Sequence, residues 1–310
     1  MALFKKLLGL KQVPGHWYHR LDAGGDTIEI TYLGTAGFII RHPHRTLVLD
    51  PYLSRHDLRH TLTAKLQIDQ QLVRETVPHA DDVLIGHAHF DHILDGPEIC
   101  LQTGARLIGS RATMMVGRAA GVPERQLVET AGREDIPCGD WIVRGLPSIH
   151  GKAAAGRVLL PGDITRPPPW PPRVGDLRHG LVLNWLVDTG GLRIVHIDSA
   201  DFINRELRGL RADVVCLCAV GRQYRPGYVK EVVELLRPRW IIPCHWDTML
   251  TPLRDAPDLM PGVDLPGFVA EVRAAGVEPL LTPMLGSQHF PACGCGDRAM
   301  HREKRETAGA

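Results

Sequence analysis

The 310-residue sequence lacks a hydrophobic run long enough to cross a bilayer. Its apolar beginning is too short for a secretory signal and has no small-residue cleavage site. We therefore expect a cytoplasmic protein. Residues 1–11 are amphipathic and can alternatively lie on an anionic membrane surface as a peripheral contact, with five apolar side chains opposite three lysines (Leu3, Phe4, Leu7, Leu8 and Leu10; Lys5, Lys6 and Lys11).

The sequence also lacks an excess of one charge. Its 36 Lys and Arg residues nearly balance 35 Asp and Glu residues, and the formal net charge is +1. A nucleic-acid partner would favour a basic surface or arm, so none is expected.

Seven cysteines, an odd number, indicate a reducing compartment rather than a disulfide framework. Cys216 and Cys218 are expected to pack in a buried strand, and Cys293 and Cys295 lack the second pair typical of a metal site.

What the sequence does contain is a dense run of metal-binding side chains, His87-Ala88-His89-Phe90-Asp91-His92. It follows the apolar stretch 83–86, which predicts a strand. Alternate residues of an extended segment share a face, so His87 and His89 point to one side, and Asp91 and His92 are free to reach a second ion. Imidazole and carboxylate ligands suit Zn²⁺, with Mn²⁺ or Fe²⁺ as alternatives. A histidine-rich surface loop is the disfavoured interpretation.

Further ligands are expected where other apolar stretches end. His150, Asp198 and His245 each follow such a stretch. Upstream, Asp50 ends another one and can hold a ligand histidine by a hydrogen bond. The sequence therefore predicts a metal centre assembled at strand ends.

This ordered set resembles the metallo-β-lactamase fold superfamily over residues 28–285. The resemblance implies an α/β fold, a four-layer αββα sandwich. It also implies a ligand set for two divalent ions, with Zn favoured in this family: His87, His89 and His150 for one, Asp91, His92 and His245 for the other, and Asp198 between them. Segments 31–38, 50–52 and 243–247 resemble the branch of ascorbate-phosphate lactonase and N-acyl-phosphatidylethanolamine phospholipase D. Asp95 has the spacing seen in that branch, or it caps the following helix.

The resemblance implies a dinuclear metal-dependent hydrolase that uses a metal-bridging hydroxide to cleave a small ester, lactone or phosphodiester. One alternative is a mononuclear iron oxygenase of a thiol substrate, which would do without His92 and His245 as ligands. A membrane-surface lipid phosphodiesterase is another. A scaffold without turnover is disfavoured by the intact ligand set. The expected partner is a small-molecule substrate, and a homo-oligomer is possible.

Around this centre the sequence offers weaker candidates. Asp91 can orient the hydroxide as well as bind metal, and His179, Arg222 and Tyr224 are candidate donors to developing negative charge. The proline-rich segment 150–180 is a long loop that can line a substrate pocket, with Leu160, Arg166 and Trp170. His196 alternates with Asp198 and is expected to be a packed core histidine.

The expected organisation is an N-terminal segment 1–26, one domain over 27–290, and a polar tail over 291–310 that is disordered. Periodicity predicts a helix over 64–75 in an insertion, helices over 93–102, 112–120, 205–210, 229–236 and 265–275, and strands over 27–34, 37–41, 45–50, 106–108, 126–130, 141–147, 181–188, 192–198, 214–219, 240–243 and 279–281.

Overall fold

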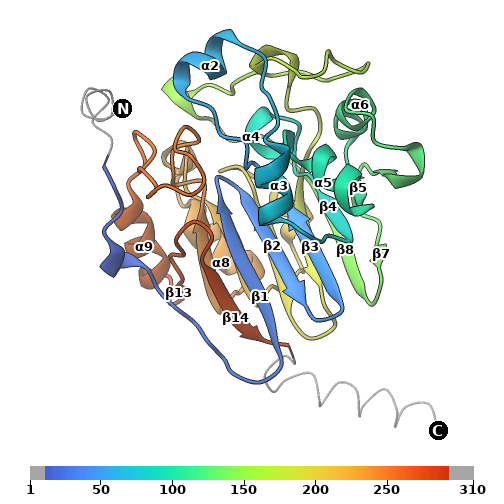
Figure 1. Ribbon diagram of the computed structural model, residues 1–310. Helices are drawn as coiled ribbons and strands as arrows, with labels where there is room; N and C mark the ends of the chain where they lie inside the picture. Colours follow the sequence, from blue (N-terminus) through green and yellow to red (C-terminus); the bar gives the residue numbers. More distant parts are fainter. Residues whose placement is uncertain (1–10, 293–310) are drawn as a thin grey trace, which may run out of the picture.

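The computed structural model describes residues 11–292, and the first of its two sheets carries strands from the first half of the chain and one from the end (Figure 1). Its seven strands run in the order β14-β1-β2-β3-β4-β5-β6. β14, β1, β2 and β3 pair antiparallel, and β3 to β6 pair parallel. The strands are β1 (Thr27–Gly34), β2 (Gly37–His42), β3 (Arg45–Leu49), β4 (Asp82–Leu84), β5 (Arg106–Gly109), β6 (Leu127–Glu129) and β14 (Ser287–Pro291).

The second sheet repeats this plan with the order β13-β12-β11-β10-β9-β8-β7. β7 to β10 pair antiparallel, and β10 to β13 pair parallel. Its strands are β7 (Ile136–Cys138), β8 (Trp141–Ser148), β9 (Val182–Asp188), β10 (Arg193–Ile197), β11 (Val214–Cys218), β12 (Trp240–Cys244) and β13 (Glu278–Pro279).

Helices cover the outer face of each sheet. On the first sheet α5 contacts β4 and β5, and α6 contacts β5 and β6; on the second, α8 packs on α9, which contacts β13. This confirms the predicted αββα sandwich. The helices are α2 (Leu58–Thr63), α3 (Gln70–Thr76), α4 (Phe90–Ile93), α5 (Gly96–Thr103), α6 (Arg111–Ala119), α7 (Asn204–Leu207), α8 (Tyr228–Leu236) and α9 (Leu265–Ala274), with short 3-10 turns η1 (Gly15–Trp17), η2 (Glu124–Gln126), η3 (Ala154–Gly156), η4 (Val174–Asp176) and η5 (Arg222–Tyr224).

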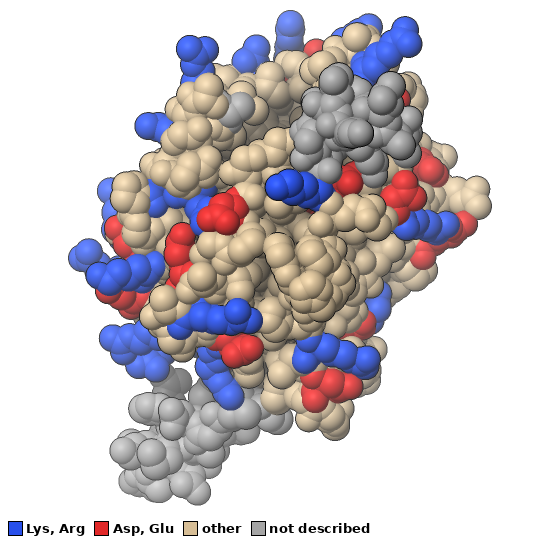
Figure 2. Space-filling view, turned by 90° about the vertical axis from the view of Figure 1, so that its left-hand side faces the viewer, with Lys and Arg blue, Asp and Glu red and all other residues tan. Residues whose placement is uncertain are grey.

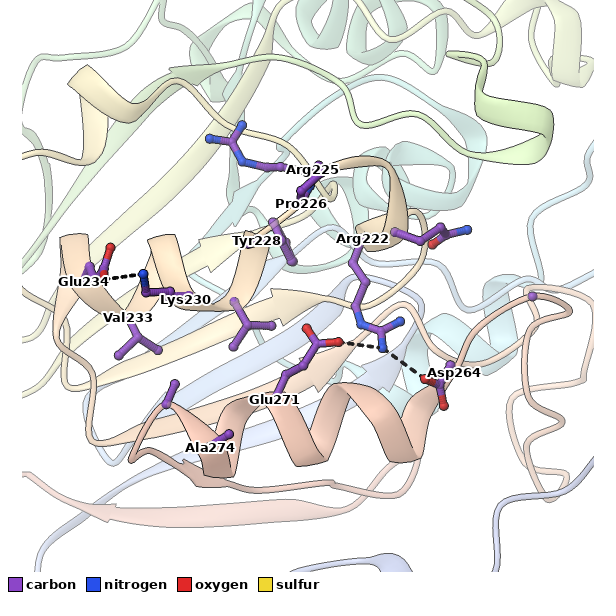
Figure 3. Close-up of a pocket in the computed structure, with 15 residues that line it drawn as sticks. Arg222, Arg225, Pro226, Tyr228, Lys230, Val233, Glu234, Asp264, Glu271 and Ala274 are labelled. Atoms are coloured by element: carbon purple, nitrogen blue, oxygen red, sulfur yellow. Dashed lines mark hydrogen bonds and ion pairs between the residues drawn. The ribbon is translucent and has the colours of Figure 1, made fainter.

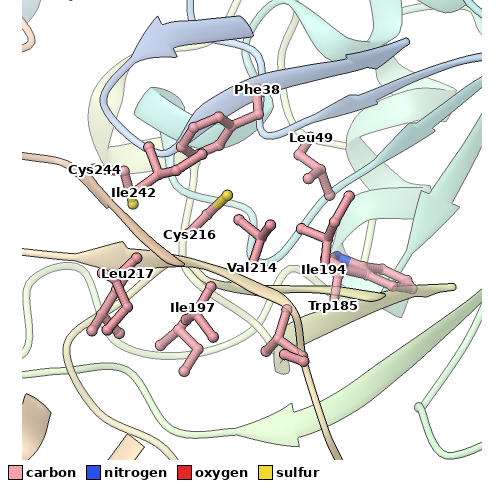
Figure 4. Packing of buried hydrophobic residues seen from close by; sticks show 14 of the residues in the cluster. Phe38, Leu49, Trp185, Ile194, Ile197, Val214, Cys216, Leu217, Ile242 and Cys244 are labelled. Atoms are coloured by element: carbon pink, nitrogen blue, oxygen red, sulfur yellow. The ribbon is translucent and has the colours of Figure 1, made fainter. Parts of the chain in front are cut away.

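The core lies between the sheets. Alternation along β3 sends Leu47 and Leu49 into this core, whereas Val48 joins a second cluster under α3, α5 and α6. Phe38 and Leu49 of the first sheet face the layer that contains Trp185, Ile194, Val214 and Cys216 (Figure 4). Both faces of the parallel strands are therefore buried, which explains why those segments are almost continuously apolar.

The ends of four strands carry the predicted site residues. Asp50 follows β3, His87 follows β4, Asp198 follows β10 and His245 follows β12. These are parallel strands of two facing sheets, so their carboxyl ends meet at one edge of the sandwich.

The insertion after β3 differs from the predicted helix over 64–75. Two shorter helices, α2 and α3, flank an extended stretch, because Asp57 and Asp69 each accept a hydrogen bond from a backbone amide of the following helix. Between them the Leu66 amide donates to the carbonyl of Pro172 at 2.7 Å. Of the predicted helix over 64–75, only the second half is helical, because Asp69 caps the start of α3; α2 ends before the predicted range.

The chain ends also differ from the expected boundaries. β14 extends to Pro291 and pairs with Thr27, so the sheet includes the first residue assigned to the tail. Residues 11–26 pack on the domain: Val13 belongs to the core, and the His19 amide donates to the Leu281 carbonyl at 2.8 Å. Most of the amphipathic segment 1–11, together with Cys293 and Cys295, lies outside the described residues.

Across residues 11–292, the structure contains no helix with the length and apolarity needed to cross a bilayer. On the face shown in Figure 2, Lys and Arg side chains are interspersed with Asp and Glu side chains.

Candidate metal centre

The strand ends bring all seven predicted ligands together. Among the described residues, three overlapping groups have potential ligand atoms within 4.8 Å of one another. His87, His89 and His150 form one group, which we call the imidazole group. Asp91, His92 and His245 form another, which we call the carboxylate group. His87, His92 and Asp198 form the group that joins these two.

Hydrogen bonds orient the rings of the imidazole group. His89 Nε2 donates to the Leu160 carbonyl at 3.3 Å, which leaves its Nδ1 facing His87 Nε2 at 3.0 Å. His150 Nδ1 donates to the Gly151 carbonyl at 2.7 Å, which leaves its Nε2 free. Two nitrogens bound to one zinc at 2.0–2.1 Å lie about 3.3 Å apart, so the His87–His89 separation suits a shared ion.

The carboxylate group is oriented in the same way. His92 Nδ1 donates to Asp50 Oδ2 at 2.8 Å, and this side chain also accepts from the Gly86 amide at 2.6 Å. His92 Nε2 then lies 3.9 Å from Asp91 Oδ2, and His245 Nε2 lies 3.2 Å from the same oxygen. The predicted contact between Asp50 and a ligand histidine is therefore present, and it fixes which nitrogen of His92 faces the centre.

Asp198 lies where the two groups meet. Its Oδ2 is 2.6 Å from His87 Nδ1 and 3.8 Å from His92 Nδ1, and its buried Oδ1 has no hydrogen-bond partner among the described residues. Gly86 allows this approach, because a Cβ there would lie 2.2 Å from Asp198 Oδ2. A buried carboxylate oxygen without a donor costs free energy unless a cation satisfies it, so the donor set fits bound metal.

Burial keeps the histidines in the neutral form that binds metal. It lowers the pKa of His87 and His92 well below the usual value and that of His89 to about 4. Burial opposes ionisation of Asp91, but His92 and His245 hold the pKa of this carboxyl well below its usual range. Burial alone would lower the pKa of His245, yet its hydrogen bond to Asp91 raises it.

Comparison with known proteins supports the same assignment. A family model described as a beta-lactamase superfamily domain matches residues 29–245. The chain belongs to this superfamily. A UPF0173 metal-dependent hydrolase of Pyrobaculum arsenaticum is 27% identical over 241 residues, which cover 76% of this chain and 92% of the relative. Another from Archaeoglobus fulgidus is 26% identical over 257 residues, which cover 79% and 94%.

Solved structures show the same fold. Igni18, a metallo hydrolase from Ignicoccus hospitalis, has a TM-score of 0.54 at 17% identity and covers 85% of this chain and 98% of its own. CmlA, a diiron β-hydroxylase from Streptomyces venezuelae, has a TM-score of 0.55 at 19% identity and covers 87% and 55%. The resemblance to the superfamily is confirmed. Like the relatives that match it, the chain is a metal-dependent hydrolase.

Sequence reasoning missed a buried network that supports the carboxylate group of this superfamily member. Arg55 Nη1 donates to Asp247 Oδ2 at 2.8 Å, and both side chains are fully buried. The other carboxylate oxygen accepts from the Thr35 amide at 2.8 Å and from the Tyr32 hydroxyl. Thr35 in turn accepts from the amide of His245 at 2.5 Å through its carbonyl. A sequence signal for this network exists, because segments 31–38 and 243–247 both resemble one branch of the superfamily.

Left-handed backbone marks the same region. Thr35, Asp50 and His245 are non-glycine residues with φ of 48°, 41° and 54°. Such conformations cost free energy in L-residues and concentrate at functional sites, where the surrounding structure holds them. All three belong to the metal centre or to its hydrogen-bonding partners.

The metal centre opens into a cavity of about 580 Å³. Leu160 and Tyr224 line it, as expected from the sequence. Trp170 and Arg166 are not among its lining residues; Trp170 packs partly buried against the cluster under the first sheet's helices. The loop after His150 therefore shapes the cavity through residues 151–160 and Val174 rather than through its proline-rich part.

Arg222 differs from the sequence expectation. Its guanidinium points between α8 and α9, where Nη2 contacts Glu271 at 3.1 Å and Asp264 at 3.3 Å (Figure 3). It lines a separate cleft of about 800 Å³, which shares only Gln223 and Gly262 with the metal cavity. Arg222 and Tyr224 belong to the same 3-10 turn, η5, but Arg222 lines this cleft and Tyr224 lines the metal cavity.

Two other candidates have defined surroundings. His179 stacks on His150 with ring centroids 5.7 Å apart and meets the His89 ring edge-on at 5.8 Å, so it lies behind two ligands and not among the cavity-lining residues. Asp95 belongs to none of the three ligand groups, and although it occupies the N-cap position of α5, its side chain makes no capping hydrogen bond. It accepts from the amides of Leu53 at 2.6 Å and Ser54 at 3.0 Å, which ties down the loop after β3.

The histidine and the cysteines that the sequence assigned to the core are buried there. His196 is fully buried, donates to the Ala36 carbonyl at 2.9 Å, and has a pKa that burial lowers to about 4. Cys216, Cys218 and Cys244 are free and buried in the second sheet, and Cys218 also reaches the cavity wall.

Proposed function

We propose that this protein is a dinuclear metal-dependent hydrolase that cleaves a small ester, lactone or phosphodiester. One observation carries the proposal: three ligand histidines, His89, His92 and His150, each commit one ring nitrogen to an acceptor outside the ligand set. Their other nitrogens are left for metal, as in known metal sites. We assign one ion to the imidazole group, one to the carboxylate group, and Asp198 to both.

Bound divalent ions would supply a water of lowered pKa and polarise the bond under attack. The residues of the chain do the rest. Asp91, whose pKa is low, would orient the attacking water as well as hold metal. The half-exposed Tyr224 hydroxyl is available to a substrate in the cavity. For His179 the geometry favours holding His89 and His150 in place, and its catalytic role stays a prediction.

The imidazole-rich ligand set favours zinc, with manganese or iron as alternatives. The mononuclear iron oxygenase is less favoured, because the carboxylate group is complete and its His92 is held by Asp50. The lipid phosphodiesterase alternative depends on the membrane affinity of residues 1–11 and is tested by liposome binding after their removal.

The test is metal content by elemental analysis, with activity measured on ester, lactone and phosphodiester substrates. We compare the natural protein with His92→Ala and with His44→Ala, an exposed histidine of the β2–β3 turn that serves as a matched control. We expect about two zinc or manganese ions per chain in the natural protein and the control. His92→Ala should lose at least one ion and the activity. One iron per chain that survives His92→Ala would overturn the proposal.

A further inference from the structure

The walls of the metal cavity are apolar, in contrast to its floor. The floor is formed by the seven ligands, whereas the walls include Phe90, Leu159, Leu160, Tyr224, Met249 and Met260. Leu159 is 48% exposed and Tyr224 is 40% exposed, so large apolar surface remains open to solvent at this place. Exposed apolar surface that converges in a concave site marks a place where a ligand is bound.

The walls come from four parts of the chain. Phe90 belongs to α4, and Leu159 and Leu160 belong to the loop that leaves His150. Tyr224 follows β11, and Met249 and Met260 follow β12. Gly156 brings the loop against Tyr224: a Cβ there would lie 3.3 Å from Tyr224 Cε1. Methionine side chains are flexible and adapt to apolar ligands of different shape.

Charged groups are scarce on these walls. Among the described residues that line the cavity, Lys152 is the one charged side chain outside the ligand set. Two arginines of the same loop are engaged elsewhere: Arg178 donates to the Pro161 carbonyl, and Arg173 donates to the Thr63 carbonyl. Recognition of a phosphodiester commonly uses arginine forks, and the cavity provides none.

We infer that the substrate is an uncharged carboxylic ester or lactone with an apolar chain, which the cavity walls hold while the carbonyl lies over the ligands. This inference rests on the proposed hydrolase function and narrows its substrate class. In the reaction, water adds its oxygen to the carbonyl carbon and the bond from that carbon to the ester oxygen breaks. The products are a carboxylate, an alcohol that takes up one proton, and one released proton; nothing is oxidised.

The first test measures hydrolysis of p-nitrophenyl acetate, butyrate, hexanoate, octanoate and decanoate by the metal-loaded protein, beside bis(p-nitrophenyl) phosphate. Burial of one methylene group is worth a factor of about four in affinity. We therefore expect kcat/KM to rise by about fourfold per methylene, chiefly through KM, until the chain outgrows the cavity. A flat series, or a preference for the phosphodiester, would overturn the inference.

A binding measurement separates this inference from the hydrolase proposal. Calorimetry with sodium acetate, hexanoate and decanoate should show affinity that rises with chain length, whether or not the protein turns over any ester. If two metal ions bind and esters are hydrolysed without chain-length dependence, the hydrolase proposal stands and the substrate class is wrong. If binding depends on chain length but no ester is hydrolysed, the apolar cavity binds acyl chains as inferred and the hydrolase proposal is wrong.

A variant locates the effect in the cavity. Leu159→Asp places a charge on the apolar wall at an exposed loop position, where loss of folding is not expected. It should reduce the ratio of decanoate to acetate activity by at least tenfold. Leu62→Asp, at a 70% exposed leucine of α2, is the matched control and should leave that ratio unchanged. An unchanged ratio in Leu159→Asp would contradict the inference.

Discussion

The two ligand groups of the metal centre are held by different means. The carboxylate group lies against the ends of β3 and β12, and a fully buried Arg55–Asp247 ion pair supports it. The imidazole group takes one ligand, His150, from the start of a long loop, and a second ligand, His89, donates to the Leu160 carbonyl of the same loop.

This difference separates a half that a buried ion pair supports from a half that a loop supports. The loop of the imidazole group contains two non-glycine residues with left-handed backbone, Ala155 and Leu160, with φ of 54° and 41°. The same loop lines the cavity. A change in the loop part of the cavity wall therefore reaches His89 directly through the Leu160 carbonyl, whereas the carboxylate group, which also lines the cavity, is supported by the buried Arg55–Asp247 pair.

The largest expected effect comes from the half that the buried ion pair supports. Asp247→Ala removes one partner of the buried ion pair and leaves the charge of Arg55 uncompensated. Breaking such a pair costs about 3–5 kcal/mol, so we expect the free energy of unfolding to fall by that amount in urea titrations. Glu75→Ala, which breaks the exposed pair with Arg254, is the control and should leave the free energy of unfolding nearly unchanged. Equal losses in the two variants would refute the contrast.

A second change distinguishes the two ligand groups directly. Asp50 accepts from both His92 Nδ1 and the Gly86 amide, and the amide of Asp50→Asn has only one oxygen to offer. We expect the affinity for the ion of the carboxylate group to fall by about 10- to 100-fold, with the ion of the imidazole group retained. Competition titration with a chelator measures both affinities. Asp57→Asn, at the exposed cap of α2, provides the control.

The pH dependence of the metal-free protein adds a third test. Burial lowers the pKa of His87, His89 and His92, that of His89 to about 4. Their folded pKa values lie below the unfolded value of about 6.5, so the unfolded chain binds more protons as pH falls. Stability should be present above pH 6.5 and be lost progressively toward pH 4, with His245 offsetting part of the loss because its pKa is raised. Thermal unfolding from pH 4 to 8 measures it; a flat profile would count against neutral buried histidines.

The smallest effect is expected from Arg222. It anchors the turn that carries Tyr224 to α9 and does not line the metal cavity. Arg222→Lys keeps the charge but loses the planar fork, so we expect a rise in KM of less than about threefold and unchanged metal content. A large loss of kcat would mean that Arg222 touches the substrate after all. Tyr224→Phe, which keeps the ring and removes the hydroxyl, is the comparison for direct contact.

Parts of this molecule were predictable because their signals are local. Most helices and strands of the two halves follow apolar periodicity. The helix predicted over 64–75 begins only at α3, which Asp69 caps, and the helix predicted over 93–102 is divided into α4 and α5. Strand β7 was not predicted. Strand β14 escaped prediction because Ser287–Pro291 is short and only Gln288 and Phe290 are buried. Its pairing with β1 depends on residues about 260 positions away.

The sequence by itself determined which candidate ligands occur, their order, and that four of them follow strands, because residue type and strand propensity are properties of short segments. Only the tertiary structure decided how these ligands are held. The partner of His89 is a backbone carbonyl, which carries no residue signal, and the partner of Arg55 lies on another strand end. The direction of Arg222 away from the cavity likewise follows from the packing of α8 and α9, not from its place in the sequence.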